Sequence, residues 1–114
     1  MNAKGQLFLV AEQDGGTIGF AGFTPNKKVE GTTHLDKLYV LPSLKGSGLG
    51  KALLDNVIIE TKRAGNSVLE LNVNKRNKAI GFYEHMGFRI VREEVIDIGK
   101  GYVMDDFVMG RVLP

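Results

Sequence analysis

The sequence contains no cysteine, no long apolar run and little net charge. The absence of cysteine excludes disulfide bonds and metal sites built on thiolates. No apolar stretch approaches the ~20 residues of a membrane-spanning helix, and residues 1–6 contain no apolar signal core. We therefore expect a cytoplasmic protein without a membrane partner.

The net charge is +2, from 15 Lys and Arg against 13 Asp and Glu. This balance is too mild to indicate a nucleic-acid partner, and the aromatic residues mostly follow core periodicity. Residues 75–78, Lys-Arg-Asn-Lys, form a local basic cluster. Such a cluster is either a solvated turn or a contact for a phosphorylated ligand, and both interpretations stay open.

At 114 residues the chain is long enough for one hydrophobic core and too short for two. We therefore expect residues 1–114 to form a single domain with one functional site. A composition of 43% hydrophobic and 25% charged residues is typical of an ordinary globular protein.

The first forty residues predict three strands. Residues 7–13 and 17–24 alternate in β-rich residues, and residues 14–16, Asp-Gly-Gly, favour a hairpin turn between them. A third strand is predicted at residues 34–40, before Pro42. Its apolar pattern is uneven, which predicts a β-bulge because an extra residue changes the face that a side chain takes.

A helix is predicted to begin at the glycine-rich loop and to stop at Gly65, which suits the position after a helix end. Its apolar stripe comprises Leu49, Ala52, Leu53 and Val57, widened by Leu54 and Ile58. Residues 68–73 then alternate as a fourth strand. A strand, helix and strand in this order predict two parallel strands.

Asn77 is predicted to cap a second, shorter helix that ends at Gly87. Residues 88–98 and 102–113 are β-rich and separated by Gly-Lys-Gly, which predicts an antiparallel hairpin. The expected fold class is therefore α/β with a mixed sheet.

Residues 45–51 read Lys-Gly-Ser-Gly-Leu-Gly-Lys and stand between a strand and a helix. Gly46, Gly48 and Gly50 let backbone N–H groups turn toward an anion at the positive end of the helix. The dinucleotide fingerprint does not fit, because the third glycine comes one residue early. The nucleotide triphosphate loop does not fit either, since Ala52 stands where Ser or Thr is required.

Residues 45–50 resemble the Q/R-x-x-G-x-G/A motif of the GCN5-related N-acetyltransferase (GNAT) family, with Lys45 in place of Gln or Arg. Residues 38–42 look like the bulged strand that leads into this motif. Residues 77–88 are similar to the family's N-x-x-A-x-x-x-Y-x-x-x-G-F helix. Two motifs in the family's order extend the resemblance over nearly the whole chain.

The resemblance implies a mostly antiparallel sheet with a central splayed parallel pair of strands and two flanking helices. It implies acetyl-CoA as acyl donor, bound between the third and fourth strands, and no metal. Lys78 is a further candidate near the phosphates. The cofactor-binding residues implied by the resemblance are Leu38, Tyr39, Val40, Lys45, Gly46, Ser47, Gly48, Leu49, Gly50, Lys51, Asn77, Ala79 and Tyr83.

For catalysis, the resemblance implies that the Val40 N–H polarises the thioester carbonyl and that Tyr83 protonates the departing thiolate. A phenol stays protonated at neutral pH, so Tyr83 can donate; alternatively it is only a core residue. His34 is the candidate base because its ordinary pKa is near 6.5, with Asp36 as second choice. A surface role for His34 and a water relay both remain open.

The expected function is transfer of an acetyl group from acetyl-CoA to a primary amine of a small molecule or peptide, by direct attack. GNAT proteins normally begin with a further strand and two helices, which this chain lacks. We expect residues 7–13 to leave a sheet edge that a second copy covers, giving a homodimer. The alternatives are a shortened or degenerate gene product and a non-catalytic acyl-CoA binding module.

Overall fold

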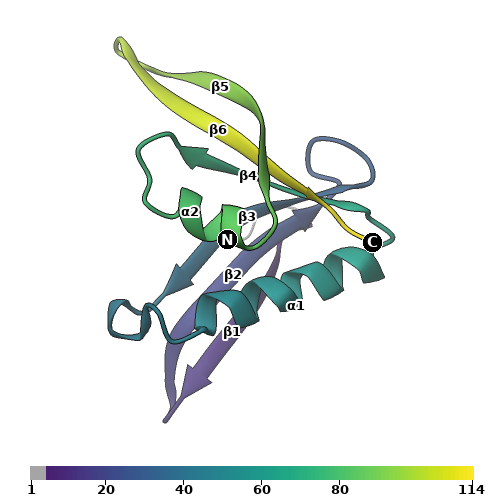
Figure 1. Cartoon of the computed structure of the whole chain (residues 1–114), viewed down its shortest axis with the longest axis vertical. Helices are drawn as coiled ribbons and strands as arrows, with labels where there is room; N and C mark the ends of the chain where they lie inside the picture. Colours follow the sequence, from purple (N-terminus) through teal and green to yellow (C-terminus); the bar gives the residue numbers. More distant parts are fainter. Residues whose placement is uncertain (1–4) are drawn as a thin grey trace.

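The computed structural model describes residues 5–114. It contains one six-stranded sheet with strand order β1-β2-β3-β4-β6-β5 (Figure 1). The observed boundaries agree with the predicted ones to within two residues. The strands are β1 (Leu7–Gln13), β2 (Gly16–Pro25), β3 (Thr32–Val40), β4 (Val68–Asn74), β5 (Arg89–Gly99) and β6 (Tyr102–Val112), and the helices are α1 (Leu49–Arg63) and α2 (Ile80–His85).

β1 and β2 form the predicted hairpin. Asp14 and Gly15, at its turn, have φ values of 51° and 80°. Two consecutive positive φ angles are typical of the turn whose twist matches that of paired strands, and Asp and Gly are among the residues that accept them. The sequence Asp-Gly-Gly therefore fixes the register of the first two strands.

β3 contains the predicted bulge, at Asp36. In the pairing with β2, Gly22 faces Lys37 and Phe23 faces Leu35, so Asp36 has no residue opposite it. The extra residue bends a strand and changes the alternation of its side chains. Leu35 and Leu38 therefore both contact the core, although they are three residues apart.

The parallel pairing of β3 with β4 ends at this bulge. Residues 32–35 pair with residues 68–71, and the ladder ends at Leu35 and Leu71. Beyond that point β3 stays paired with β2, whereas β4 stays paired with β6. The sheet therefore divides into two arms, which confirms the predicted splayed central pair.

α1 connects β3 to β4. Leu54 and Val57 are fully buried against the sheet, and each contributes about 1.5–3 kcal/mol by leaving water. Thr61 is buried as well, so the apolar stripe is centred on Leu54, Val57 and Thr61. Ala52, which was predicted to lie on this stripe, is exposed because it points away from that centre. The helix ends as predicted, with Gly65 at a φ of 80°.

α2 is a short helix of six residues, and Ala79 occupies its N-cap position. The prediction of Asn77 as the cap was wrong by two residues. The Asn77 side chain accepts a hydrogen bond from the Ala79 N–H at 2.8 Å, and its carbonyl accepts one from Ile80. Asn77 thus forms a turn that precedes the helix instead of capping it directly.

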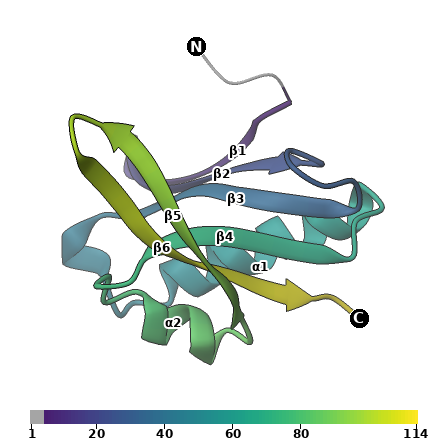
Figure 2. The ribbon, with the colours of Figure 1, turned by 90° about the horizontal axis from the view of Figure 1, so that it is seen from above.

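Both helices cover the same face of the sheet (Figure 2). Side chains from α1, α2 and the strands form one hydrophobic core on that side. The opposite face, which we call the open face, carries no helix from residues 5–114, and the β5–β6 hairpin rises on that side (Figure 2). No helix among residues 5–114 is long and apolar enough to cross a membrane.

The bulge residue also anchors a polar network on the open face. The Asp36 carboxylate accepts hydrogen bonds from Lys27 at 2.7 Å, Thr24 at 2.6 Å, Gln6 at 2.9 Å and His34 at 3.0 Å. Burial of Asp36 acts to raise its pKa, but these hydrogen bonds outweigh it and lower the pKa from 3.8 to about 2. The bulge is therefore stabilised by four side chains from different parts of the chain.

The network predicts a pH-dependent contribution to stability. The unfolded chain takes up a proton near pH 3.8 and the folded protein only near pH 2, so stability from Asp36 is present above this window and lost as the pH falls through it. The shift corresponds to about 2 kcal/mol. We expect Asp36→Asn to lower the free energy of unfolding at neutral pH, and this deficit to shrink by about that amount at pH ~2 in urea titrations.

Asp14→Asn is the matched control, because Asn accepts the turn conformation as well as Asp does. The difference in free energy of unfolding between Asp14→Asn and the wild type is expected to vary little with pH. A deficit of Asp36→Asn that stays constant down to pH ~2 would contradict a paired carboxylate at the bulge.

Candidate active site

The gap between β3 and β4 is lined by unpaired backbone. The Leu41 N–H donates to the Ile18 carbonyl at 2.8 Å, so it points toward β2. Because consecutive N–H groups of an extended strand point to opposite edges, the Val40 N–H points toward the gap. Leu38 lies two residues earlier and has the same orientation. The end of β3 thus offers backbone groups to an extended ligand.

The glycine-rich loop lies at the end of this gap. Gly46 and Gly48 have φ values of 85° and 91°, and a Cβ on either would meet open space. Only glycine adopts this backbone without strain. The amides of Gly46, Gly48, Gly50 and Lys51 donate no hydrogen bond to any described residue. A set of unsatisfied N–H groups at a helix N-terminus is a site for an anion such as a pyrophosphate.

The third glycine of the motif has a different role. Gly50 lies inside α1, and a Cβ there would lie 3.5 Å from the Phe82 ring and 3.7 Å from the Val40 side chain. It therefore allows close packing of α1, α2 and β3. Among the three predicted glycines, only Gly46 and Gly48 shape the loop backbone.

The side chains of the loop are exposed and available to a ligand. Lys45 and Ser47 lie on the surface, and the Ser47 hydroxyl accepts a hydrogen bond from the Leu49 N–H at 3.4 Å. The Lys51 ammonium contacts Asp55 at 2.8 Å on the exposed face of α1. A surface pair of this kind contributes only about 0.3–0.5 kcal/mol, so a phosphate can displace it.

Tyr83 lies on α2, on the helix side of the sheet. Its ring packs edge-on against Phe82 and Phe88, with centroid distances of 5.3 and 5.8 Å. Burial raises the pKa of its phenol, and no described residue forms a hydrogen bond with its hydroxyl. The phenol therefore stays protonated at neutral pH.

His34 lies on the open face, opposite Tyr83. Its neighbours Thr33 and Leu35 are buried toward the helices, so His34 points the other way. Its Nδ1 faces the Asp36 carboxylate at 3.0 Å, and its Nε2 faces the Asn72 side-chain oxygen at 3.1 Å. The structure thus brings the two predicted candidate bases into contact.

The orientation of the Asn72 side chain follows from its other contact. The Asn72 amide nitrogen donates to Glu94 at 3.0 Å, which directs the Asn72 oxygen toward His34. Both ring nitrogens then face oxygen acceptors and can both donate only if both carry a proton. Both ring nitrogens of His34 are therefore occupied by contacts within the protein.

Sequence reasoning missed Asn72, Glu94 and Asp106, which the strand register places on the same face of the sheet as His34. We call His34, Asp36, Asn72, Glu94 and Asp106 the open-face cluster. Asn72 alternates with the core residues Leu71 and Val73, so its polar side chain in a buried strand was a usable signal. Glu94 and Asp106 face each other across β5 and β6, a register that the sequence does not reveal.

The other predicted cofactor residues lie on β3, at the start of α2 and in the turn before it. Leu38 is half-buried at the core, Tyr39 stacks on Phe20 on the open face with a centroid distance of 5.4 Å, and Ala79 caps α2. Asn77 and Lys78 are exposed before α2. They remain within the basic cluster predicted from the sequence.

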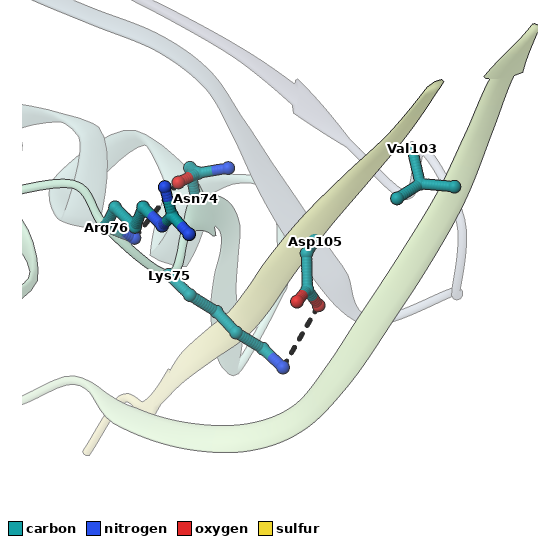
Figure 3. A pocket seen from close by; sticks show the side chains of 5 residues that line it. All are labelled: Asn74, Lys75, Arg76, Val103 and Asp105. Atoms are coloured by element: carbon teal, nitrogen blue, oxygen red, sulfur yellow. Dashed lines mark hydrogen bonds and ion pairs between the residues drawn. The ribbon is translucent and has the colours of Figure 1, made fainter. Parts of the chain in front are cut away.

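A cavity of about 400 Å³ lies beyond the end of β4, against β6 (Figure 3). Lys75, one of its lining residues, contacts Glu93 and lies 3.0 Å from Asp105. Hydrogen bonds from these partners, Glu93 first, raise the pKa of Lys75. Its charge is therefore already paired within the protein. The cavity is lined by Asn74, Lys75, Arg76, Val103 and Asp105.

Comparison with known proteins connects this geometry to a family. Residues 1–103 match the family described as "Acetyltransferase (GNAT) domain". The chain is 42% identical over 71 residues to the peptidyl-lysine N-acetyltransferase YjaB of Salmonella typhimurium, covering 60% of this chain and 46% of that protein. It is 30% identical over 101 residues to the L-amino acid N-acyltransferase MnaT of Escherichia coli, covering 86% of this chain and 58% of that protein.

The chain thus spans about half the length of these curated relatives. Among solved structures, yncA of Salmonella typhimurium with its cofactor acetyl-CoA superimposes with a TM-score of 0.78 at 29% identity. The match covers 96% of this chain and 66% of that one. The fold and the family match together show that this chain belongs to the GNAT acetyltransferase family.

Proposed function

We propose that this chain is a single N-acetyltransferase domain that transfers the acetyl group of acetyl-CoA to a primary amine by direct attack. The observation that carries the proposal is the opening of the sheet at the Asp36 bulge beside the loop of residues 45–51. The opening provides unpaired backbone groups at the end of β3, and the loop provides unpaired amide N–H groups. An acyl donor with an extended arm and a pyrophosphate needs both.

The donor binds from the helix side in this proposal. Its pyrophosphate lies on the amides of residues 46–51, with Lys45, Lys51 and Lys78 near the phosphates. Its pantetheine arm pairs with Leu38 and Val40 as an added strand would. The Val40 N–H then donates to the thioester oxygen, a contact worth roughly 3 to 4 kcal/mol when negative charge develops there.

Proton transfers occur on the two faces of the sheet. The amine attacks the thioester carbon, the C–S bond breaks, and the Tyr83 hydroxyl protonates the departing thiolate of CoA. On the open face the Nε2 lone pair of His34 takes the proton from the amine, directly or through water, after Nε2 has left Asn72 and while the Nδ1–H donates to Asp36. A raised phenol pKa suits the acid role because the proton stays available at neutral pH.

Relatives with related folds use different acceptors. By their names, YjaB acts on peptidyl lysine and MnaT on L-amino acids. We propose a small molecule or peptide amine as acceptor here. We also propose action in the cytoplasm, with which a cysteine-free chain is compatible, and a homodimer in which a second copy covers the β1 edge.

A second candidate function is acyl-CoA binding without turnover. It is favoured by the contacts that occupy both nitrogens of His34. Titration with acetyl-CoA shows binding under either function. Release of free thiol that requires an added amine is expected only for the enzyme. Binding without amine-dependent release across a panel of amines, amino acids and lysine peptides would contradict the proposed activity.

Tyr83→Phe tests the acid role. We expect kcat to fall by roughly a hundredfold, because the thiolate loses its proton donor while acetyl-CoA binding is retained. Tyr102→Phe, at the exposed tip of the β5–β6 hairpin, is the matched control. The measurement is thiol release at neutral pH in single turnovers, where chemistry limits the rate. Equal rates for wild type and Tyr83→Phe would exclude the role.

Gly48→Ala tests the anion loop. A side chain at a φ of 91° is strained by about 1–2 kcal/mol, so the loop rearranges and its amides lose their common direction. We expect the Kd for CoA to rise about tenfold or more by calorimetry.

Gly31→Ala is the control for Gly48→Ala, because Gly31 has a φ of 87° and open space around its Cβ but lies away from the loop. It is expected to lose similar stability and to bind CoA as the wild type does. Equal affinity of both variants would place the pyrophosphate elsewhere.

A further inference from the structure

Asp106 is a buried acidic residue with an unsatisfied carboxylate oxygen among residues 5–114. It lies on β6, paired in register with Asn74 of β4 and Glu94 of β5. It is only 2% exposed, and its Oδ1 atom has no hydrogen-bond partner among the described residues. Leaving a buried polar oxygen unsatisfied costs roughly 1–3 kcal/mol, and more if it is charged. In a native structure such a group is accounted for by a functional role, a bound ion or ligand, or an ordered water.

The neighbouring carboxylates already have cationic partners. Lys27 contacts Asp36 at 2.7 Å. The Arg92 guanidinium lies 3.4 Å from a carboxylate oxygen of Glu70 and 3.5 Å from one of Glu94, so it forms an ion pair with each. No lysine or arginine among residues 5–114 forms an ion pair with Asp106. Among residues 5–114, Asp106 is therefore the acidic residue of the open-face cluster that has no cationic partner.

Asp106 also lies near the opening of the sheet. Its partner Asn74 comes three residues after Leu71, where the pairing of β3 with β4 ends. Side chains of Asn72 and Asn74 point to the same face, so Asp106 shares the open face with His34. The β5–β6 hairpin rises on this side (Figure 2).

We propose that Asp106, supported by Glu94, binds a second positive charge on the amine acceptor. The acceptor is then a diamine, or a lysine side chain beside another cation, whereas an α-amino acid would bring its carboxylate against these acidic groups. The reacting amine lies at the gap and the second cation lies at Asp106. This inference rests on the acetyltransferase activity proposed above and adds the class of its acceptor.

Asp106→Asn removes the negative charge and keeps the shape of the side chain. The probes are 1,4-diaminobutane, which carries two charges, and n-butylamine, which carries one. We expect the wild type to prefer the diamine in kcat/KM by about tenfold or more, and Asp106→Asn to lose most of that preference. Asp105→Asn, one residue away on the opposite face, is the matched control and should keep it. A lysine peptide with and without a neighbouring arginine distinguishes peptide from small-molecule acceptors.

Binding is measured separately from turnover. We expect 1,4-diaminobutane to raise the melting temperature of wild type and of Asp105→Asn, and to raise that of Asp106→Asn much less. Butylamine and magnesium chloride, at matched charge concentration, should raise the melting temperature of the wild type less than 1,4-diaminobutane does. Glu94→Gln provides a second variant, in which the preference for the diamine is expected to weaken.

The outcomes separate the two proposals. If no amine releases thiol, the proposed activity is wrong whatever the melting temperatures show. If both amines are acetylated with the same preference by wild type and by Asp106→Asn, the activity stands and the assignment of Asp106 is overturned. The assignment of Asp106 would also be overturned if the wild type preferred an α-amino acid to the diamine. The same holds if magnesium raised its melting temperature as much as the diamine does.

Discussion

The extra residue at Asp36 is the constraint on which the rest of the site depends. A regular β3 would continue its parallel ladder with β4 and satisfy the backbone groups that now face the gap. The bulge bends β3 away from β4, and each strand keeps its outer neighbour. The four hydrogen bonds to the Asp36 carboxylate offset the conformational cost of this interruption.

The sheet that opens at this point has two chemically different faces. On the helix side lie the amides of the glycine loop and the buried phenol of Tyr83, which suit a phosphorylated thioester. On the open face lie the carboxylates, amides and imidazole of the open-face cluster, which suit an amine. In the proposed function, acyl donor and acceptor reach the gap from opposite sides, so neither has to displace the other.

Local sequence signals predicted those parts of the fold that local chemistry decides. The Asp-Gly turn, the bulged strand, the glycine loop and Gly65 were correct because each depends on backbone preferences of a few residues. The cap of α2 was misplaced because residues 78–79 form a turn before the helix begins at Ile80. The open-face cluster was largely missed, since it needs the register of β4, β6 and β5, which long-range pairing sets.

The central claim is that the gap between β3 and β4 holds the reacting thioester. A crystal structure with bound CoA tests it most directly. The account predicts the pyrophosphate on the amides of residues 46–51, and the sulfur in the gap within hydrogen-bonding reach of the Tyr83 hydroxyl and beside the Val40 N–H. A cofactor bound in the cavity beside Lys75, or with its sulfur outside the gap, would contradict the account.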